Sequence, residues 1–239
     1  MTDILPLNQI LLGNNLELLA TLPDNSLDAI VTDPEYGTAS KTKVQKRGNK
    51  LVEFNISWDG SFPTAWIALA TKKLKPGGSL ISFTDNKRVE TLWNALKANG
   101  LNPLQNLYWY KTNPPPQPRK NFQSAIETAV FARKPGKIIY WGGGGATPNV
   151  FQYPIVTGPE RTAHPTQKPV PVMRWLISLV CPVGGVVCDP FAGSGTTCEA
   201  AWLRGRNYIG MEFDPEYHAI ATARLANVQP NIQFSEMIG

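Results

Sequence analysis

The chain alternates short apolar runs with segments in which apolar side chains recur every three or four positions. The first pattern is typical of buried strands and the second of helices that cover a sheet. The expected strands are Leu27–Thr32, Ser79–Thr84, Leu107–Lys111, Glu127–Arg133, Gly185–Cys188 and Asn207–Glu212. The expected helices are Leu16–Leu22, Thr64–Leu74, Lys87–Ala98, Val172–Val180, Thr196–Arg204 and Pro215–Asn227. Strands that alternate with helices predict an α/β domain with a largely parallel sheet.

Domain organisation follows from length and from one break in this rhythm. With 239 residues, 42% of them hydrophobic, the chain can bury the core of one large domain, which we assign to residues 1–239. Residues 113–159 are rich in proline and contain a run of four glycines, so we expect a loop-rich insertion within that domain.

Cysteine usage and hydropathy exclude two classes of protein. The three cysteines are an odd number without the paired short spacings of a zinc site, which argues against a disulfide scaffold and against a metal cluster. The longest uncharged run, residues 138–159, is interrupted by glycine and proline and is not expected to span a membrane. The start of the chain has no basic region typical of a signal peptide, so we expect a cytoplasmic protein.

The net charge of +5 is unevenly distributed. Residues 41–50 and residues 111–137 each carry an excess of five positive charges, whereas the rest of the chain is acidic overall. Two basic segments on an acidic body predict a polyanionic partner such as nucleic acid. The alternative is a pair of ordinary solvated lysine-rich loops.

The first motif that carries chemistry is residues 188–197, CDPFAGSGTT, between an expected strand and an expected helix. Its glycines allow a ligand to approach the backbone at the carboxyl end of a strand, where open α/β sheets bind small molecules. Glu212 ends the next strand, a position suited to ribose hydroxyls, so we predict a nucleoside cofactor. The alternatives are a tight structural turn or a nucleotide-dependent oxidoreductase, although the third glycine of the dinucleotide fingerprint is absent.

The second motif is residues 32–37, TDPEYG, also after an apolar strand. A carboxylate, a proline carbonyl and an aromatic ring in sequence can accept hydrogen bonds from an amino group while the ring stacks on a flat base. The tetrapeptide DPEY recurs at residues 214–217. There a helical pattern follows directly, which predicts Asp214 as an N-cap, Pro215 as the first helical residue and Glu216 as a first-turn acid.

The order of the DPxY motif, a proline-rich basic insertion, residues 164–169 (HPTQKP) and then DPFAGSGT resembles the β group of DNA amino-methyltransferases over nearly the whole chain. The resemblance implies a Rossmann-like fold with a mostly parallel seven-stranded sheet, in which the catalytic half precedes the cofactor half. It implies S-adenosyl-L-methionine as cofactor and methylation of adenine N6 or cytosine N4. His164 and Pro165 are interpreted mainly as a turn.

By the same resemblance, two sets of residues receive roles. The catalytic set is Asp33, Pro34 and Tyr36. The cofactor-binding set is Thr166, Lys168, Asp189, Phe191, Gly193, Ser194, Gly195, Thr196 and Glu212. Asp33 and the Pro34 carbonyl would accept hydrogen bonds from the amine of an extruded base stacked on Tyr36, and alignment would supply most of the rate. All of this requires that the strands ending at Asp33 and Asp189 are neighbours, so that Asp33 faces a methyl donor near Gly193.

One departure from the family pattern is Glu35, where a second proline is usual. A carboxylate beside Asp33 leaves two hypotheses open, an active enzyme and a catalytically impaired DNA-binding relative. Adenine N6 is favoured over cytosine N4 because an Asp-headed motif is commoner among N6 enzymes of the family. Cytosine C5 chemistry would need a thiolate nucleophile, and no cysteine lies near Asp33 in the sequence.

Double-stranded DNA is the expected partner, and the two basic segments are expected to bind it. The DNA-binding candidates are Lys41, Lys43, Lys46, Arg47, Arg119 and Lys120. Such side chains grip phosphates without reading sequence, so we assign target recognition to residues 113–159. The resemblance further implies a bacterial or phage origin and allows a homodimer, with no metal ion and no membrane association.

Overall fold

The computed structural model describes residues 4–34, 64–116, 121–162, 164 and 166–229, and the backbone of residues 44–47 and 50–53. Its main sheet contains β1 (Gln9–Leu12), β2 (Leu27–Thr32), β5 (Leu74–Thr84), β6 (Asn102–Tyr110), β7 (Ile126–Arg133), β8 (Val150–Gln152), β9 (Val186–Asp189) and β10 (Asn207–Glu212). The helices are α1 (Asn15–Thr21), α2 (Ala65–Lys73), α3 (Val89–Ala98), α4 (Val170–Val180), α5 (Thr196–Trp202) and α6 (Pro215–Ala226), with a short 3₁₀ turn at Gly158–Glu160.

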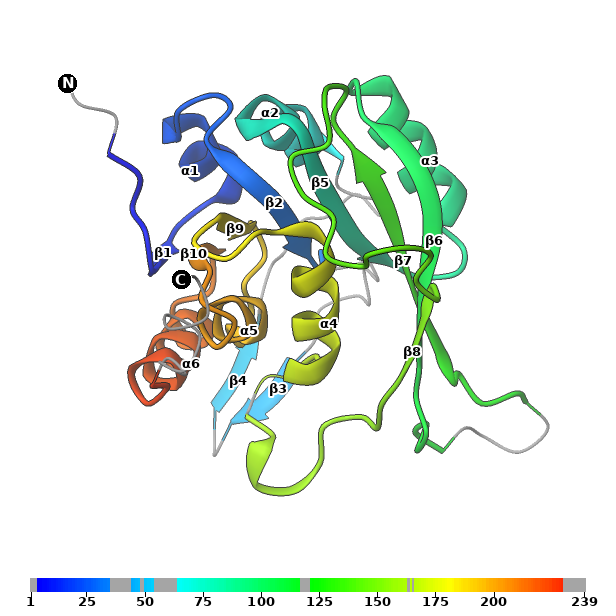
Figure 1. Ribbon diagram of the computed structural model, residues 1–239. Coiled ribbons are helices and arrows are strands. Elements are labelled where there is room, and N and C mark those ends of the chain that lie inside the picture. Colours follow the sequence, from blue (N-terminus) through cyan, green and yellow to red (C-terminus); the bar gives the residue numbers. More distant parts are fainter. Residues whose placement is uncertain are drawn as a thin grey trace.

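The strand order of the sheet is β1-β10-β9-β2-β5-β7-β6-β8 (Figure 1). Most neighbours are parallel, but β7 runs antiparallel to both β5 and β6. The predicted α/β fold with a mostly parallel sheet is therefore confirmed, with eight strands in place of seven. The edge strand β8 adds to β6 from within residues 113–159.

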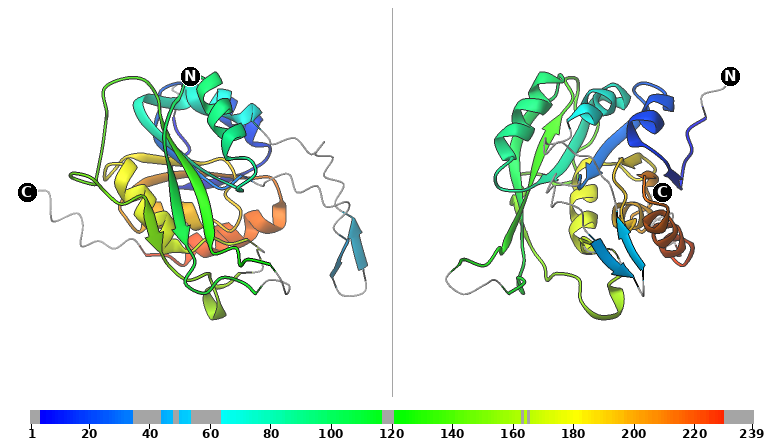
Figure 2. Two further views of the ribbon diagram at one scale, coloured as in Figure 1. Left: turned by 90° about the vertical axis from the view of Figure 1, so that its right-hand side faces the viewer. Right: turned by 180° about the vertical axis from the view of Figure 1, so that it is seen from behind.

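Helices cover both faces of the sheet in three layers (Figures 1 and 2). The first core cluster packs α1, α2 and α3 on one face, around Leu19, Trp66 and Leu92. The second packs α4 and α5 on the other face, around Met173 and Ala200. Because side chains alternate along a strand, successive residues of the central strands β2 and β9 serve different clusters, and both strands are buried along their whole length.

Residues 113–159 are only partly a loop-rich insertion. They include β7, whose central residues are buried between β5 and β6, as well as the edge strand β8. The connections around these strands carry the irregular chain that the prolines and glycines predict. Strands β3 (Val44–Arg47) and β4 (Lys50–Glu53) pair with each other as a separate antiparallel hairpin.

Two further observations concern sequence predictions. Asp214 caps α6 through its side chain, which accepts hydrogen bonds from the backbone N–H groups of Glu216 and Tyr217, so the structural interpretation of the second DPEY string is confirmed. Among the described residues, no helix combines the length and the apolar composition needed to cross a bilayer.

Candidate active site

The two motifs meet at the end of the sheet where the parallel strands β2 and β9 finish. Strands β2 and β9 are parallel neighbours, with Ala29 opposite Val187 and Ile30 opposite Cys188. Their carboxyl ends therefore lie side by side, and the Thr32 hydroxyl donates a buried hydrogen bond of 2.7 Å to Asp189 Oδ1. The prediction that these strands are neighbours is confirmed, although 157 residues separate Thr32 from Asp189.

Asp33 follows β2 directly and belongs to a chain of charged side chains. Its carboxylate accepts a hydrogen bond from the Lys168 ammonium, which is 8% exposed and comes from the segment before α4. Lys168 Nζ also lies 3.1 Å from Glu127 Oε2, and Glu127 Oε1 lies 2.7 Å from Lys111 Nζ. The row therefore alternates in sign from Lys111 to Asp33.

Opposite charges keep these buried groups ionised. Burial by itself would lower the pKa of Lys168, but the carboxylates of Asp33 and Glu127 raise it above its usual value. Burial would raise the pKa of Glu127, but Lys168 and Lys111 lower it below its usual value. Both groups are therefore charged at neutral pH.

The segment between β9 and α5 forms a compact turn. Gly193 and Gly195 have φ values of +52° and +78°, which favour glycine. A side chain at Gly195 would also meet the Ala221 Cβ of α6 at 3.0 Å. Phe191 packs edge-on against Trp66 of α2, with 5.6 Å between ring centroids. The turn is therefore held from both faces of the sheet.

Glu212 and two hydroxyl groups fix this turn. Glu212 Oε2 accepts a hydrogen bond of 2.7 Å from the Gly193 N–H, and its Oε1 accepts one of 2.8 Å from the Asp214 N–H. Ser194 and Thr196 are buried, and their hydroxyl oxygens lie 3.0 Å apart. Glu212 thus stands at the carboxyl end of β10, beside the glycine turn, where the sequence places a ribose-binding carboxylate.

Asp189 lies at the centre of the site and is 3% exposed. Burial raises its pKa to about 6, although hydrogen bonds from Thr197, Thr32 and the Phe191 N–H oppose the increase. The folded protein therefore holds a proton on Asp189 more tightly than the unfolded chain does.

This shift predicts a pH dependence of stability. Because the folded pKa is raised, the stabilisation from protonation is complete below the usual pKa of 3.8 and is lost as the pH rises through about 6. Urea unfolding between pH 4 and pH 7 should show the wild type losing roughly 3 kcal/mol relative to Asp189→Asn. Equal slopes for the two proteins would contradict the shift.

His164 is half-buried and lies against the glycine turn. Its ring meets Tyr217 edge-on at 4.5 Å, and a Cβ at Gly193 would lie 3.0 Å from its Nε2 atom. Its Nδ1 atom is buried without a hydrogen-bond partner among the described residues. Burial lowers the pKa of His164, so the ring is neutral at physiological pH, as suits a residue that shapes the turn.

The structure brings together most of the predicted site residues. Asp33, buried Pro34, Lys168, the segment from Asp189 to Thr196, and Glu212 share one edge of the sheet. Thr166 is exposed two residues before Lys168. Tyr36, Glu35, Lys41, Lys43, Arg119 and Lys120 lie outside the described residues, and Lys46 and Arg47 are described only as backbone of β3. Clusters of three or more metal-ligating side chains are absent from the described part of the chain.

Sequence reasoning missed Glu127 and Lys111. Both lie at the ends of predicted strands, and Glu127 is the single acid in the basic segment 111–137. An isolated acid at the start of an otherwise apolar strand was the available signal. Its partner Lys168 is 41 residues away in sequence, and only the fold places the two together.

Comparisons with known proteins show which family the chain is similar to. The model of a DNA methylase family of N6 and N4 methyltransferases matches residues 27–223. The type II methyltransferase M2.MboI of Moraxella bovis is 30% identical over 91% of this chain and 87% of its own length. The type II methyltransferase M.HinfI of Haemophilus influenzae is 29% identical over 97% of this chain and 72% of its own.

Solved structures extend the likeness to three dimensions. An M1.HpyAVI–SAM complex superposes with a TM-score of 0.72 at 26% identity, covering 92% of this chain and 99% of that one. The cytosine-N4-specific PvuII DNA methyltransferase shares the fold, with a TM-score of 0.69 at 21% identity and coverage of 93% and 86%. The chain therefore belongs to the DNA methylase family of N6 and N4 amino-methyltransferases, enzymes that take their methyl group from S-adenosylmethionine.

Proposed function

We propose that this DNA methyltransferase modifies the exocyclic amine of a base flipped out of double-stranded DNA, with adenine N6 as its main target. The observation that carries the proposal is the position of Asp33. Its carboxylate stands at the tip of β2, next to the tip of β9 and the glycine turn, and Lys168 holds it there. A hydrogen-bond acceptor thus lies beside the expected cofactor site.

The residues of the turn fit the cofactor. Two glycines with positive φ form a turn that lets a ligand approach the backbone closely, and Glu212 supplies a carboxylate at the end of β10 for ribose hydroxyls. We propose that Phe191, Gly193, Ser194, Gly195, Thr196, Asp189, Thr166 and Glu212 form this binding site. When bound, S-adenosylmethionine supplies a methyl group on a sulfonium centre.

Asp33 and Pro34 would act on the amine. An exocyclic amine is a poor nucleophile because its lone pair is delocalised into the ring. Hydrogen bonds from its two protons to the Asp33 carboxylate and to the Pro34 carbonyl would aim the lone pair out of the ring plane, while Tyr36 stacks on the base. Lys168 fixes the direction of the Asp33 carboxylate, so the acceptor is positioned before the base arrives.

DNA would approach the protein at the carboxyl ends of the parallel strands, where Asp33 lies. Strand β6 runs in the same direction as β2 and β5, so the connection from β6 to β7 leaves the sheet at the edge where β2 ends. This connection contains Arg119 and Lys120, and the segment after β2 contains Lys41, Lys43, Lys46 and Arg47. We propose that these residues contact phosphates and that residues 113–159 contribute to target recognition. A homodimer and a cytoplasmic location complete the proposal.

Nucleoside analysis tests the reaction. Purified protein is incubated with unmethylated duplex DNA and methyl-labelled S-adenosylmethionine, and the DNA is digested and analysed by mass spectrometry. We expect labelled N6-methyldeoxyadenosine. Labelled N4-methyldeoxycytidine alone would overturn the preference for adenine.

The same assay, combined with a gel shift, tests whether Glu35 impairs catalysis. A gel shift without any methylated nucleoside would identify a catalytically impaired relative. The variant Glu35→Pro restores the usual family sequence, and we expect its rate to remain close to that of the wild type. A large gain in rate would instead mean that Glu35 impairs the native protein.

A further inference from the structure

Four charged side chains form a continuous row that ends at the Asp33 carboxylate. Lys111 follows β6, Glu127 belongs to β7, Lys168 precedes α4 and Asp33 follows β2. The Lys111–Glu127 and Glu127–Lys168 contacts are 2.7 Å and 3.1 Å, and Lys168 donates to Asp33. The Lys168 ammonium therefore contacts two carboxylates, Asp33 and Glu127, that come from strands distant in sequence.

We infer that Glu127 is a positioning residue for methyl transfer, which holds the Lys168 ammonium in the place where it orients Asp33. The inference rests on the proposed role of Asp33. Glu127 acts through Lys168, because the structure records its carboxylate in contact with Lys111 and Lys168.

The backbone explains why Glu127 is suited to this task. Its strand β7 is paired on both sides, with Glu127 opposite Trp109 of β6 and Thr128 opposite Thr84 of β5. The position of Glu127 is therefore fixed by the sheet. Lys168 instead comes from an irregular segment and has a long side chain with many rotamers, so it needs an external anchor.

Burial makes that anchor necessary. Lys168 is 8% exposed, and its Nζ lies 5.1 Å from the centre of the Phe83 ring, which favours a cation but does not fix a direction. Glu127 supplies a second directional contact in addition to that of Asp33. It also balances the row, since two ammonium groups face two carboxylates. Replacing Glu127 by glutamine removes one of the two carboxylates that hold the Lys168 ammonium.

Lys111 also links this row of charged side chains to the loop between β6 and β7. Its backbone N–H donates to the Ala125 carbonyl at 2.8 Å, and its Nζ lies 3.5 Å from the Ser124 carbonyl oxygen. Lys111 thus closes the base of the segment that we propose to contact DNA, and it holds Glu127 from the side opposite Lys168.

Steady-state kinetics of Glu127→Gln tests the inference. We expect kcat to fall between about 10- and 100-fold, while KM for DNA and the cofactor Kd from calorimetry change less than about threefold, because misplacement of Asp33 affects the reacting geometry. Glu127→Asp should recover part of kcat. In a double-mutant cycle, Lys111→Gln added to Glu127→Gln should cost little more, since both act through Lys168.

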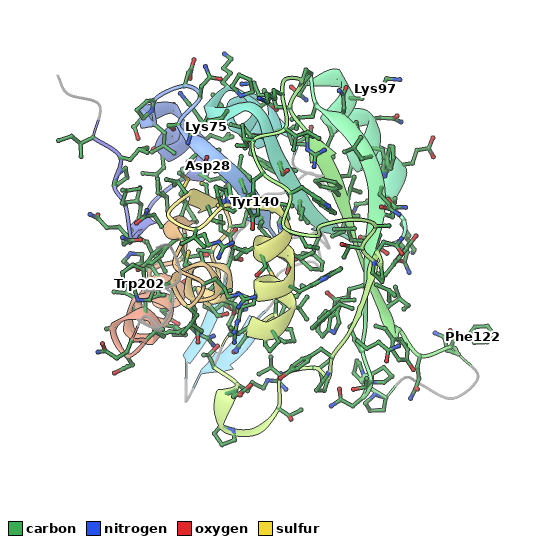
Figure 3. The ribbon with its side chains drawn as sticks, in the orientation of Figure 1. Asp28, Lys75, Lys97, Phe122, Tyr140 and Trp202 are labelled. Atoms are coloured by element: carbon green, nitrogen blue, oxygen red, sulfur yellow. The ribbon has the colours of Figure 1, made fainter. Side chains whose placement is uncertain are left out.

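The matched control is Asp28→Asn at the opposite edge of the same sheet. Asp28 begins β2 and pairs with Lys75 of β5 at 2.7 Å, as a structural ion pair (Figure 3). The Asp28→Asn substitution should lower the free energy of unfolding and leave kcat unchanged. A kcat for Glu127→Gln within twofold of wild type, or an equal loss of kcat in Asp28→Asn, would overturn the inference.

Asp33→Ala separates the two proposals. An inactive Asp33→Ala with a normal Glu127→Gln refutes only the positioning role, whereas an active Asp33→Ala refutes the catalytic role itself.

Discussion

Asp33→Ala is expected to reduce kcat by on the order of 10³-fold, the largest effect of any single change at the site. The substitution removes the carboxylate that we propose as acceptor for the target amine. Folding should survive, because Lys168 keeps the half-buried Glu127 carboxylate as a counterion. The cofactor Kd, measured by calorimetry, should change little. Rates are followed by transfer of labelled methyl groups to duplex DNA.

Two variants sharpen this experiment. Asp33→Asn keeps the shape and a carbonyl oxygen acceptor but loses the charge that attracts Lys168, so we expect an intermediate rate. Glu90→Gln removes one negative charge from the exposed surface of α3 and should behave as wild type. Retention of more than a tenth of the wild-type kcat by Asp33→Ala would exclude Asp33 from the chemistry.

Lys168→Met should have the largest effect on stability. The change removes the cation that lies between the carboxylates of Asp33 and Glu127 at a buried position. Breaking a buried ion pair by removing one partner costs about 3–5 kcal/mol, because the remaining charge is left without compensation. Urea unfolding at pH 7 measures the loss, and methyl transfer should fall with it, because Asp33 is no longer oriented.

The control for this prediction is Lys73→Met, which removes a lysine of similar exposure whose partner, the Asp24 carboxylate, is 60% exposed. Its cost should be smaller than that of Lys168→Met. The double variant Lys168→Met/Glu127→Gln should regain part of the lost stability, since it removes one of the two carboxylates. If both lysine variants cost the same, the buried row has no special energetic role.

Much of the fold could be predicted because its signals are local. Apolar runs mark β2, β9 and β10, and the periodic segments mark all six helices. Strand β1 was missed because it is a four-residue edge strand with partly exposed side chains. Strand β5 was expected to begin at Ser79, yet it begins at Leu74. Its register with β2 shifts between Leu27 and Ala29, which accommodates the proline and glycines that suggested a break.

The site could be predicted only in part, because some of its contacts join residues that are far apart in the sequence. The loop after β9 and Glu212 after β10 are readable because each motif is contiguous or follows a strand. Lys168 was assigned to the cofactor by resemblance, whereas its described contacts are with Asp33 and Glu127. These contacts span 135 and 41 residues. No local pattern encodes such a pair, because it depends on which strands become neighbours.

The strand order has a consequence for biosynthesis. On the ribosome, β2 emerges long before β9, although the two are neighbours in the finished sheet. Contacts between segments so far apart form late, since a long loop must close first. The nascent chain can pair β2 with β5, and β5 with β7, but Asp33 meets the glycine turn only after β9 has been synthesised. We therefore expect methyl transfer activity only after β9 and the glycine turn have been synthesised and have docked beside β2.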